Sequence, residues 1–134
     1  IGMGLNAKLS QNLILCNLLQ GFNEGMVLAS KAGVDPDLML DILNNSAARS
    51  GLISVKGPNV LKRDFSTNFS VRWMHKDIGL MLDSATELGV PVPLTAVTRQ
   101  MFQAAMAEGH ADEDIISTIK VLERMVGVEV KSAL

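Results

Sequence analysis

Residues 5–32 read LNAKLSQNLILCNLLQGFNEGMVLASKA, a stretch long enough for about eight turns of α-helix. Its apolar side chains point in almost every direction around such a helix: Leu9, Leu13, Ile14, Leu15, Cys16, Leu18, Leu19, Phe22, Met26, Val27 and Leu28. A helix that is apolar on all faces is typical of a buried position. The stretch therefore predicts a central helix against which the rest of the chain packs. Along it, Gly21, Gly25 and Ala29 form a stripe of small side chains where another backbone could approach closely.

Start and stop signals divide the rest of the chain into shorter helices. Candidate C-terminal caps are Gly33, Gly89, Gly109 and Gly127, and candidate N-caps are Asp35, Ser70 and Asp112. These signals predict helices over residues 36–43, 51–61 with an interruption at Pro58, 71–88, 94–108 and 113–126. Alternation of β-branched residues never lasts more than a few positions. We therefore predict an all-α fold, a helical bundle around a long buried first helix.

Composition places this bundle in a single domain covering residues 1–134. Hydrophobic residues make up 48% and charged residues 19% of the chain, which excludes intrinsic disorder. The single cysteine, Cys16, excludes an intramolecular disulfide and is predicted to fill the core. The absence of a signal-peptide pattern and of a long apolar run predicts a cytoplasmic protein without a membrane partner. A sequence that starts at Ile1 rather than Met indicates a piece of a longer protein.

The charges are unevenly distributed along the chain. Residues 49–76 carry six basic side chains against one acidic, a net +5, whereas residues 77–134 carry four basic against nine acidic, a net −5. A basic segment in an acidic chain favours contact with an anion or an acidic surface, although scattered solvated charges explain it equally well. Nucleic acid is not predicted as a partner, because the net charge is −2 and aromatic residues do not alternate with basic ones.

The first residues contain a misleading pattern and an informative one. Gly2-Met-Gly4-Leu-Asn-Ala7 matches a dinucleotide-binding fingerprint, but no strand follows it and the helix is far too long, so we reject a Rossmann unit here. Lys8 and Asn12 are four residues apart and share one helix face. An ammonium beside an amide can bind a carboxylate or a hydroxyl, although such a pair at a helix start is more often simply solvated.

Two sequence blocks resemble the β-hydroxyacid dehydrogenase family, which includes 3-hydroxyisobutyrate, tartronate semialdehyde and 6-phosphogluconate dehydrogenases. The first block is Gly2-x-Gly4-x-x-x-Lys8-x-x-x-Asn12, and the second is Lys76-Asp77-Ile78-Gly79-Leu80 followed by Asp83 and Ala85. The resemblance covers nearly the whole chain and corresponds to the family's C-terminal helical domain, with the 6-phosphogluconate dehydrogenase C-terminal domain-like fold. It implies that the family's N-terminal Rossmann domain lies outside this chain.

The resemblance also implies functions for individual residues. Lys8 would be the catalytic acid and base, Asn12 and Asp83 would bind the substrate, and Lys76 would contact the cofactor, NAD or NADP. Gln11 departs from the His of the sugar-acid branch, which favours a small 3-hydroxy acid or semialdehyde over 6-phosphogluconate. Asp77 is expected to point away from this site. We expect no metal site, because His75 and His110 lack partners at ligand spacing.

The resemblance further implies partners: the chain's own Rossmann domain and, as is common in this family, further copies of the same subunit. By itself the chain is expected to be inactive, because half of the nucleotide site would be missing. Two alternatives stay open at this point. The chain could be a helical assembly domain with no activity of its own, or an unrelated helical binding module.

Overall fold

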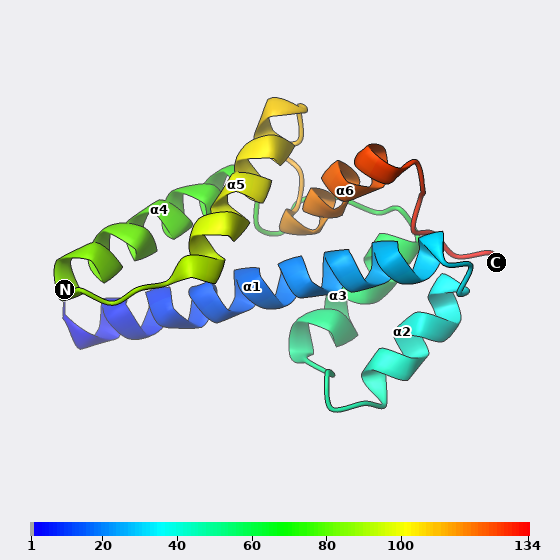
Figure 1. Cartoon of the computed structure of the whole chain (residues 1–134), viewed down its shortest axis with the longest axis horizontal. Helices are drawn as coiled ribbons and strands as arrows, with labels where there is room; N and C mark the ends of the chain where they lie inside the picture. Colours follow the sequence, from blue (N-terminus) through cyan, green and yellow to red (C-terminus); the bar gives the residue numbers. More distant parts are fainter. Residues whose placement is uncertain (1) are drawn as a thin grey trace.

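The computed structural model describes residues 2–134, and its longest element is helix α1 (Met3–Lys31). Figure 1 shows α1 running along most of the length of the molecule, with α4, α5 and α6 on one side and α2 and α3 beside its C-terminal half. All five of these helices pack against α1. The predicted central helix is therefore confirmed in position and extent.

The remaining helices are close to those predicted from the sequence. They are α2 (Pro36–Asn44), α3 (Gly51–Leu61), α4 (Val71–Leu88), α5 (Pro93–Ala107), the 3-10 turn η1 (Ile115–Thr118) and α6 (Ile119–Val126). Residues 2–134 form no β-strand, and only an isolated bridge joins Ser70 and Asp114. The all-α prediction is therefore confirmed.

Two of the three predicted N-caps are confirmed by their hydrogen bonds. The Asp35 carboxylate accepts from the Leu38 amide at 3.2 Å, and the Ser70 hydroxyl accepts from the Trp73 amide at 3.2 Å. The third prediction is wrong, because Asp114 rather than Asp112 caps the last helical segment by accepting from the Ile116 amide at 3.1 Å. That segment consequently begins as the 3-10 turn η1, two residues later than predicted.

Helix α3 also differs from the prediction, since it is not interrupted at Pro58. The helix continues to Leu61, and the Lys62 amide donates to the Pro58 carbonyl at 3.0 Å. Proline has no amide hydrogen to donate to the carbonyl one turn earlier. Here that carbonyl belongs to the exposed Ser54, where water can donate the hydrogen bond instead.

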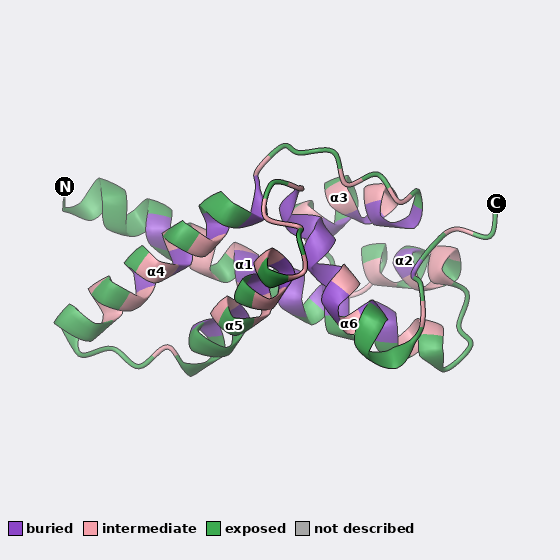
Figure 2. Cartoon of the chain, turned by 90° about the horizontal axis from the view of Figure 1, so that it is seen from above, coloured by how far each residue is buried: buried purple, intermediate pink, exposed green. Residues whose placement is uncertain are grey.

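The prediction that α1 is buried on all sides is wrong for one face. Cys16 and Met26 on the covered side are fully buried, whereas Ile14 keeps 60% and Leu28 keeps 73% of their surface exposed. Within the described chain, no atom lies within 4 Å of a Cβ placed on Gly21. Figure 2 shows the buried residues gathered where the helices cross, with exposed ribbon along other parts of α1. The chain therefore leaves one face of its central helix exposed.

Part of the basic segment is neutralised inside the fold. The Lys56 ammonium lies 3.1 Å from the Asp114 carboxylate, whose side chain has no exposed surface. Asp114 also accepts from the backbone amides of Asn68 at 3.0 Å and Phe69 at 3.2 Å. The buried carboxylate therefore joins α3, the loop before α4, and η1, and both of its oxygens accept hydrogen bonds.

A second internal ion pair ties α3 to the end of the chain. The Arg63 guanidinium donates to both carboxylate oxygens of Glu123, at 2.6 and 2.9 Å, and to the Val130 carbonyl at 3.1 Å. The Val130 amide returns a hydrogen bond to Glu123 at 2.7 Å. Arg63 adopts a left-handed backbone conformation with φ 58°, which the two-pronged pairing holds in place. The acidic surface that Lys56 and Arg63 meet is thus the chain's own C-terminal part.

Candidate active site

The candidate site begins at the N-terminal half of α1. Lys8 is exposed and Asn12, one turn later, is half-buried against α4. Among the described residues, no carboxylate lies within ion-pair distance of the Lys8 ammonium. The helix therefore presents a free cation beside an amide that is partly fixed by its neighbours.

The neighbour that fixes Asn12 is Asp77. The Asn12 side-chain amide donates to the Asp77 carboxylate at 3.4 Å, across the packed pair α1 and α4. The expectation that Asp77 points away from the site is therefore wrong. Asp77 directly precedes the buried Ile78, which places it at the edge of the α4 face that packs on α1. With one amide hydrogen engaged, Asn12 keeps its oxygen and a second hydrogen for a ligand.

Lys76 occupies the next position on α4 and points outward. Its ammonium lies 5.0 Å from the centre of the Trp73 ring, and the Trp73 side chain is itself 54% exposed. A cation over an aromatic face is held by the ring's electrons but keeps its hydrogen-bond donors free. Among the described residues, Lys76 pairs with no carboxylate. Its ammonium is therefore free to bind an anion.

The structure does not join Asp83 to these residues. Asp83 is exposed and follows Lys76 by seven residues, which places both on the face of α4 opposite the buried Met74 and Ile78. No described hydrogen bond or ion pair links Asp83 to Lys8 or Asn12. The structure thus brings Lys8, Asn12 and Asp77 together, and leaves Lys76 and Asp83 on a neighbouring, outward face.

A polar network that has no motif in the sequence lies one turn beyond Asn12. The Asn17 amide donates to the Thr95 hydroxyl at 2.9 Å, and its oxygen accepts from the Thr98 hydroxyl at 2.6 Å. Both threonines are buried, so this network fixes the start of α5 against α1. No local signal could have revealed a contact between residues about 80 positions apart, whereas Asp77 could have been suspected from its place beside Lys76.

Two other titratable side chains near the site, Cys16 and His75, are wholly or partly buried in the helical packing. Burial raises the pKa of the Cys16 thiol to about 12, which suits the predicted core residue and leaves no thiolate nucleophile at neutral pH. Partial burial and, second, the Arg99 cation lower the pKa of His75.

In the described part of the chain, no three His, Cys, Asp or Glu side chains come together in an arrangement that could hold a metal ion. No helix described here combines the length and apolar character needed to cross a membrane.

Comparison with known proteins identifies the family. Residues 2–122 match the family described as "NAD-binding of NADP-dependent 3-hydroxyisobutyrate dehydrogenase". The chain belongs to this family. The Lys8–Asn12 and Lys76–Asp77 blocks therefore indicated the correct relatives.

Several characterised members of the 3-hydroxyisobutyrate dehydrogenase family resemble the chain over most of its length. It is 37% identical over 131 residues to 2-(hydroxymethyl)glutarate dehydrogenase from Eubacterium barkeri, covering 96% of this chain and 43% of that protein. It is 31% identical over 124 residues to 2-hydroxy-3-oxopropionate reductase from Escherichia coli, covering 92% and 42%. The chain thus spans less than half the length of these relatives.

Solved structures of the family share the helical fold. The chain superposes on 3-hydroxyisobutyrate dehydrogenase from Salmonella typhimurium with a TM-score of 0.83 and 29% identity, covering 87% of this chain and 41% of that one. The corresponding enzyme from Mycobacterium tuberculosis gives a TM-score of 0.77 with 26% identity, covering 87% and 42%. A helical bundle built around a long first helix is therefore a feature that the chain shares with these dehydrogenases.

Proposed function

We propose that the chain is the C-terminal helical domain of a cytoplasmic NAD(P)-dependent dehydrogenase acting on a small 3-hydroxy acid or semialdehyde. The substrate would be of the 3-hydroxyisobutyrate or tartronate semialdehyde class. The observation that carries the proposal is the free Lys8 ammonium one turn from Asn12, whose amide is held by Asp77, in a chain of an NAD-binding dehydrogenase family. The N-terminal Rossmann domain of the longer protein would supply most of the nucleotide site.

Lys8 is the group that would move the substrate proton. In the oxidation direction its neutral amine accepts the proton of the substrate hydroxyl, and in reduction its ammonium returns a proton to the carbonyl oxygen. Bound NAD or NADP would supply the hydride acceptor in oxidation, or the hydride donor in reduction, at the substrate carbon that bears this oxygen. Because Lys8 has no carboxylate partner in the described chain, its nitrogen is available to the substrate oxygen.

Asn12 would orient the substrate rather than transfer a proton. Its bond to Asp77 fixes the plane of the amide, so that the oxygen and the remaining hydrogen face a defined direction. Holding a reacting oxygen in place beside Lys8 removes rotational freedom before the reaction, which is a large part of what enzymes contribute.

The outward face of α4 would meet the cofactor and the rim of the substrate pocket. The Lys76 ammonium, supported by Trp73 and free of carboxylates in the described chain, fits the anionic phosphates of a dinucleotide. Asp83 shares that face and would border the substrate pocket. Because Lys76 and Asp83 point away from the helical core, this is the side on which we place the Rossmann domain.

The decisive test is Lys8→Ala in the longer protein that contains this chain. We expect turnover to fall by about 10²- to 10⁴-fold, the usual cost of losing acid–base catalysis, with unchanged helical circular dichroism. Lys62→Ala is the matched control, because Lys62 is also an exposed lysine but lies at the C-terminal end of α3, and it should retain normal turnover. A Lys8→Ala enzyme that keeps more than about a tenth of the rate would contradict the assignment.

The exposed apolar face of α1 favours a second function for the same domain. A side chain such as Ile14, 60% exposed in a helix that is otherwise the core of the bundle, is typical of a surface that another subunit covers. We propose that the protein is a homo-oligomer assembled through its helical domain. This function is compatible with catalysis and would be retained by the chain alone, which we expect to show neither turnover nor nicotinamide binding.

A further inference from the structure

Helix α5 contains a single charged residue, Arg99, and its side chain extends onto α4. A Cβ placed on Gly79 of α4 would lie only 2.9 Å from Arg99 Nη2, so the guanidinium occupies the room that a glycine leaves. No carboxylate of the described residues lies within ion-pair distance of Arg99. The cation is therefore held between two helices without a counter-charge.

The guanidinium of Arg99 is enclosed at one end and open at the other. Its Nε is buried and has no hydrogen-bond partner, whereas its two Nη nitrogens are not enclosed in this way and also bond no described residue. The enclosed end fixes the direction in which the Nη pair points. A cation that has lost part of its hydration without gaining an acceptor is stabilised by an anion at its remaining donors.

An apolar crevice of about 300 Å³ lies close to Arg99 along the same two helices. Residues 89–92 turn the chain so that α5 runs back along α4 (Figure 1). Leu82 and Ala96 line the crevice, and each lies three residues, about 4.5 Å of helix, from Gly79 or Arg99 respectively. The remaining lining consists of Thr86 and the apolar residues Ala85, Val90, Pro91, Val92 and Pro93. We call the crevice and the Arg99 cation together the α4–α5 groove.

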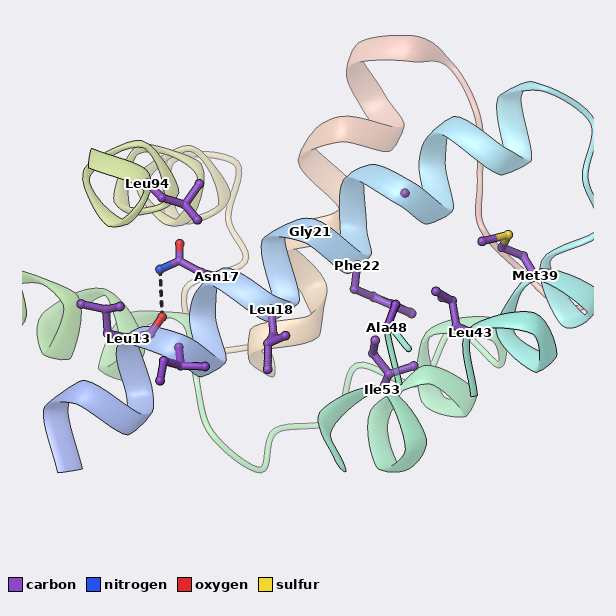
Figure 3. A pocket seen from close by; sticks show the side chains of 12 residues that line it. Leu13, Asn17, Leu18, Gly21, Phe22, Met39, Leu43, Ala48, Ile53 and Leu94 are labelled. Atoms are coloured by element: carbon purple, nitrogen blue, oxygen red, sulfur yellow. Dashed lines mark hydrogen bonds between the residues drawn. The ribbon is translucent and has the colours of Figure 1, made fainter. Parts of the chain in front are cut away.

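The α4–α5 groove is separate from the candidate active site. Asp77, which bonds Asn12 of α1, precedes Gly79 by two residues, so the two positions point about 160° apart around α4. On α5, Leu94 faces α1 across the apolar cavity shown in Figure 3. Arg99 follows Leu94 by five residues and points about 140° away from it. The groove therefore opens on a different side of both helices.

The charges around the guanidinium favour a singly charged ligand. Lys76 and Asp83 lie about one turn before and after Gly79, and their opposite charges cancel. Burial and, second, the charge of Arg99 lower the pKa of His75, so its imidazole is neutral at pH 7. The net charge is then that of Arg99 alone. The planar fork of a guanidinium matches the two oxygens of a carboxylate.

We propose that the α4–α5 groove binds a short-chain monocarboxylate, with its carboxylate on the Nη nitrogens of Arg99 and its hydrocarbon chain in the crevice beside Leu82 and Ala96. Such a ligand supplies both of the partners that the groove lacks, an acceptor for the cation and an apolar group for the crevice. The site is independent of Lys8 and does not rest on the proposed dehydrogenase activity. The competing interpretation is an arginine that only covers apolar surface with its stem and keeps its head in water.

The first experiment titrates the chain with n-butyrate at pH 7 and follows the backbone amide of Gly79 by NMR. We expect a saturable shift of this amide. Acetate, which lacks the hydrocarbon chain, and n-butanol, which lacks the charge, should both bind more weakly. The absence of a saturable shift with butyrate would overturn the proposal. Inorganic phosphate that binds as tightly as butyrate would overturn the choice of a monocarboxylate.

The second experiment removes the cation. Arg99→Met should raise the dissociation constant of butyrate by about tenfold or more, the usual effect of losing hydrogen bonds to a charged group. Arg49→Met is the matched control, because Arg49 is an exposed arginine outside the groove whose guanidinium donates to the Ser46 carbonyl at 2.9 Å. Unchanged binding by Arg99→Met, or an equal loss in both variants, would overturn the proposal.

Gly79→Ala provides a test that does not depend on the folding of Arg99→Met. Alanine favours a helix more than glycine does, so this variant should fold at least as well. Its methyl group would displace the guanidinium and should therefore weaken butyrate binding. Gly25→Ala is the control, because no atom lies within 4 Å of a Cβ at that position of α1. Butyrate binding by Gly79→Ala that equals that of the unmodified chain would overturn the proposed geometry.

Two further measurements separate this site from the rest of the protein. Lys8→Ala should bind butyrate as tightly as the unmodified chain, and a loss of binding would place butyrate at the candidate active site and overturn the proposal. Butyrate should also raise the melting temperature of the longer protein. Binding to the chain alone would contradict the proposal, since another part of the protein would then occupy the groove. None of these measurements requires turnover or cofactor, so the groove and the dehydrogenase proposal fail separately.

Discussion

The basic residues of the segment 49–76 divide into two groups with opposite surroundings. Lys56 and Arg63 are paired with buried carboxylates from the C-terminal part of the chain, and their charges are used within the fold. Lys76, from the same segment, is exposed and has only an aromatic ring beneath it. Lys8 on α1 is likewise exposed and pairs with no carboxylate of the described residues. The contrast teaches that net charge along a sequence locates cations, whereas their partners in the fold decide which of them can bind a ligand.

The largest effect on stability is expected where this contrast is strongest, at Asp114. Removing a buried carboxylate leaves Lys56 and two loop amides without their acceptor, so Asp114→Ala should lower the free energy of unfolding by about 3–5 kcal/mol. Asp112→Ala is the control, because its pair with Arg72 is exposed and should contribute at most about 1 kcal/mol. Urea unfolding of both variants measures the difference, and equal losses would remove the distinction between the two groups.

A smaller effect is expected at Asn12, which belongs to the site but not to the core. In the longer protein, Asn12→Ala should lower kcat/KM for the hydroxy acid by about tenfold, which is the value of one well-placed hydrogen bond. The free energy of unfolding should change little. Ser10→Ala, an exposed position on the same helix, is the control. If both kcat and KM stay unchanged, Asn12 is a residue of the helix surface that only bonds Asp77.

The smallest effect is expected at Lys76, because an exposed cation is screened by salt. Lys76→Met in the longer protein should raise the cofactor KM by a few fold at low salt and flatten its dependence on ionic strength, since screening acts over about 8–10 Å in ordinary buffers. Lys62→Met, from the same basic segment, is the comparison and should raise the cofactor KM less. Tight cofactor binding by Lys76→Met at low salt would mean that Lys76 is a solvated or interface cation that does not contact the cofactor.

The parts of the fold that the sequence predicts well are those governed by local rules. Asp35 and Ser70 cap helices because their oxygens bond amides three residues away, and the length of α1 follows from an apolar pattern that meets no stop signal before Gly33. The family likewise follows from two short blocks. Pro58 marks the limit of such rules, because the helix continued where water could replace one lost hydrogen bond.

The parts that could not be predicted depend on contacts between distant residues. An apolar pattern shows that α1 must be covered, but only the positions of α2, α4 and α5 show that one face stays open. Asp77 turns toward Asn12 because α1 and α4 pack side by side, 65 residues apart in the sequence. The cap at Asp114 was missed for the same reason, since besides the Ile116 amide of its own segment it binds Lys56 and the loop amides of Asn68 and Phe69, all of them distant in the sequence.

The pairing of Arg63 with Glu123 and Val130 has a consequence for biosynthesis. The guanidinium is made 67 residues before the Val130 carbonyl that it binds, which at about 5–20 residues per second is a wait of roughly 3–13 s on the ribosome. For most of that time α1 lacks α6, which packs against it in the finished fold. Helix α1 is therefore complete well before the last helix that covers it is made.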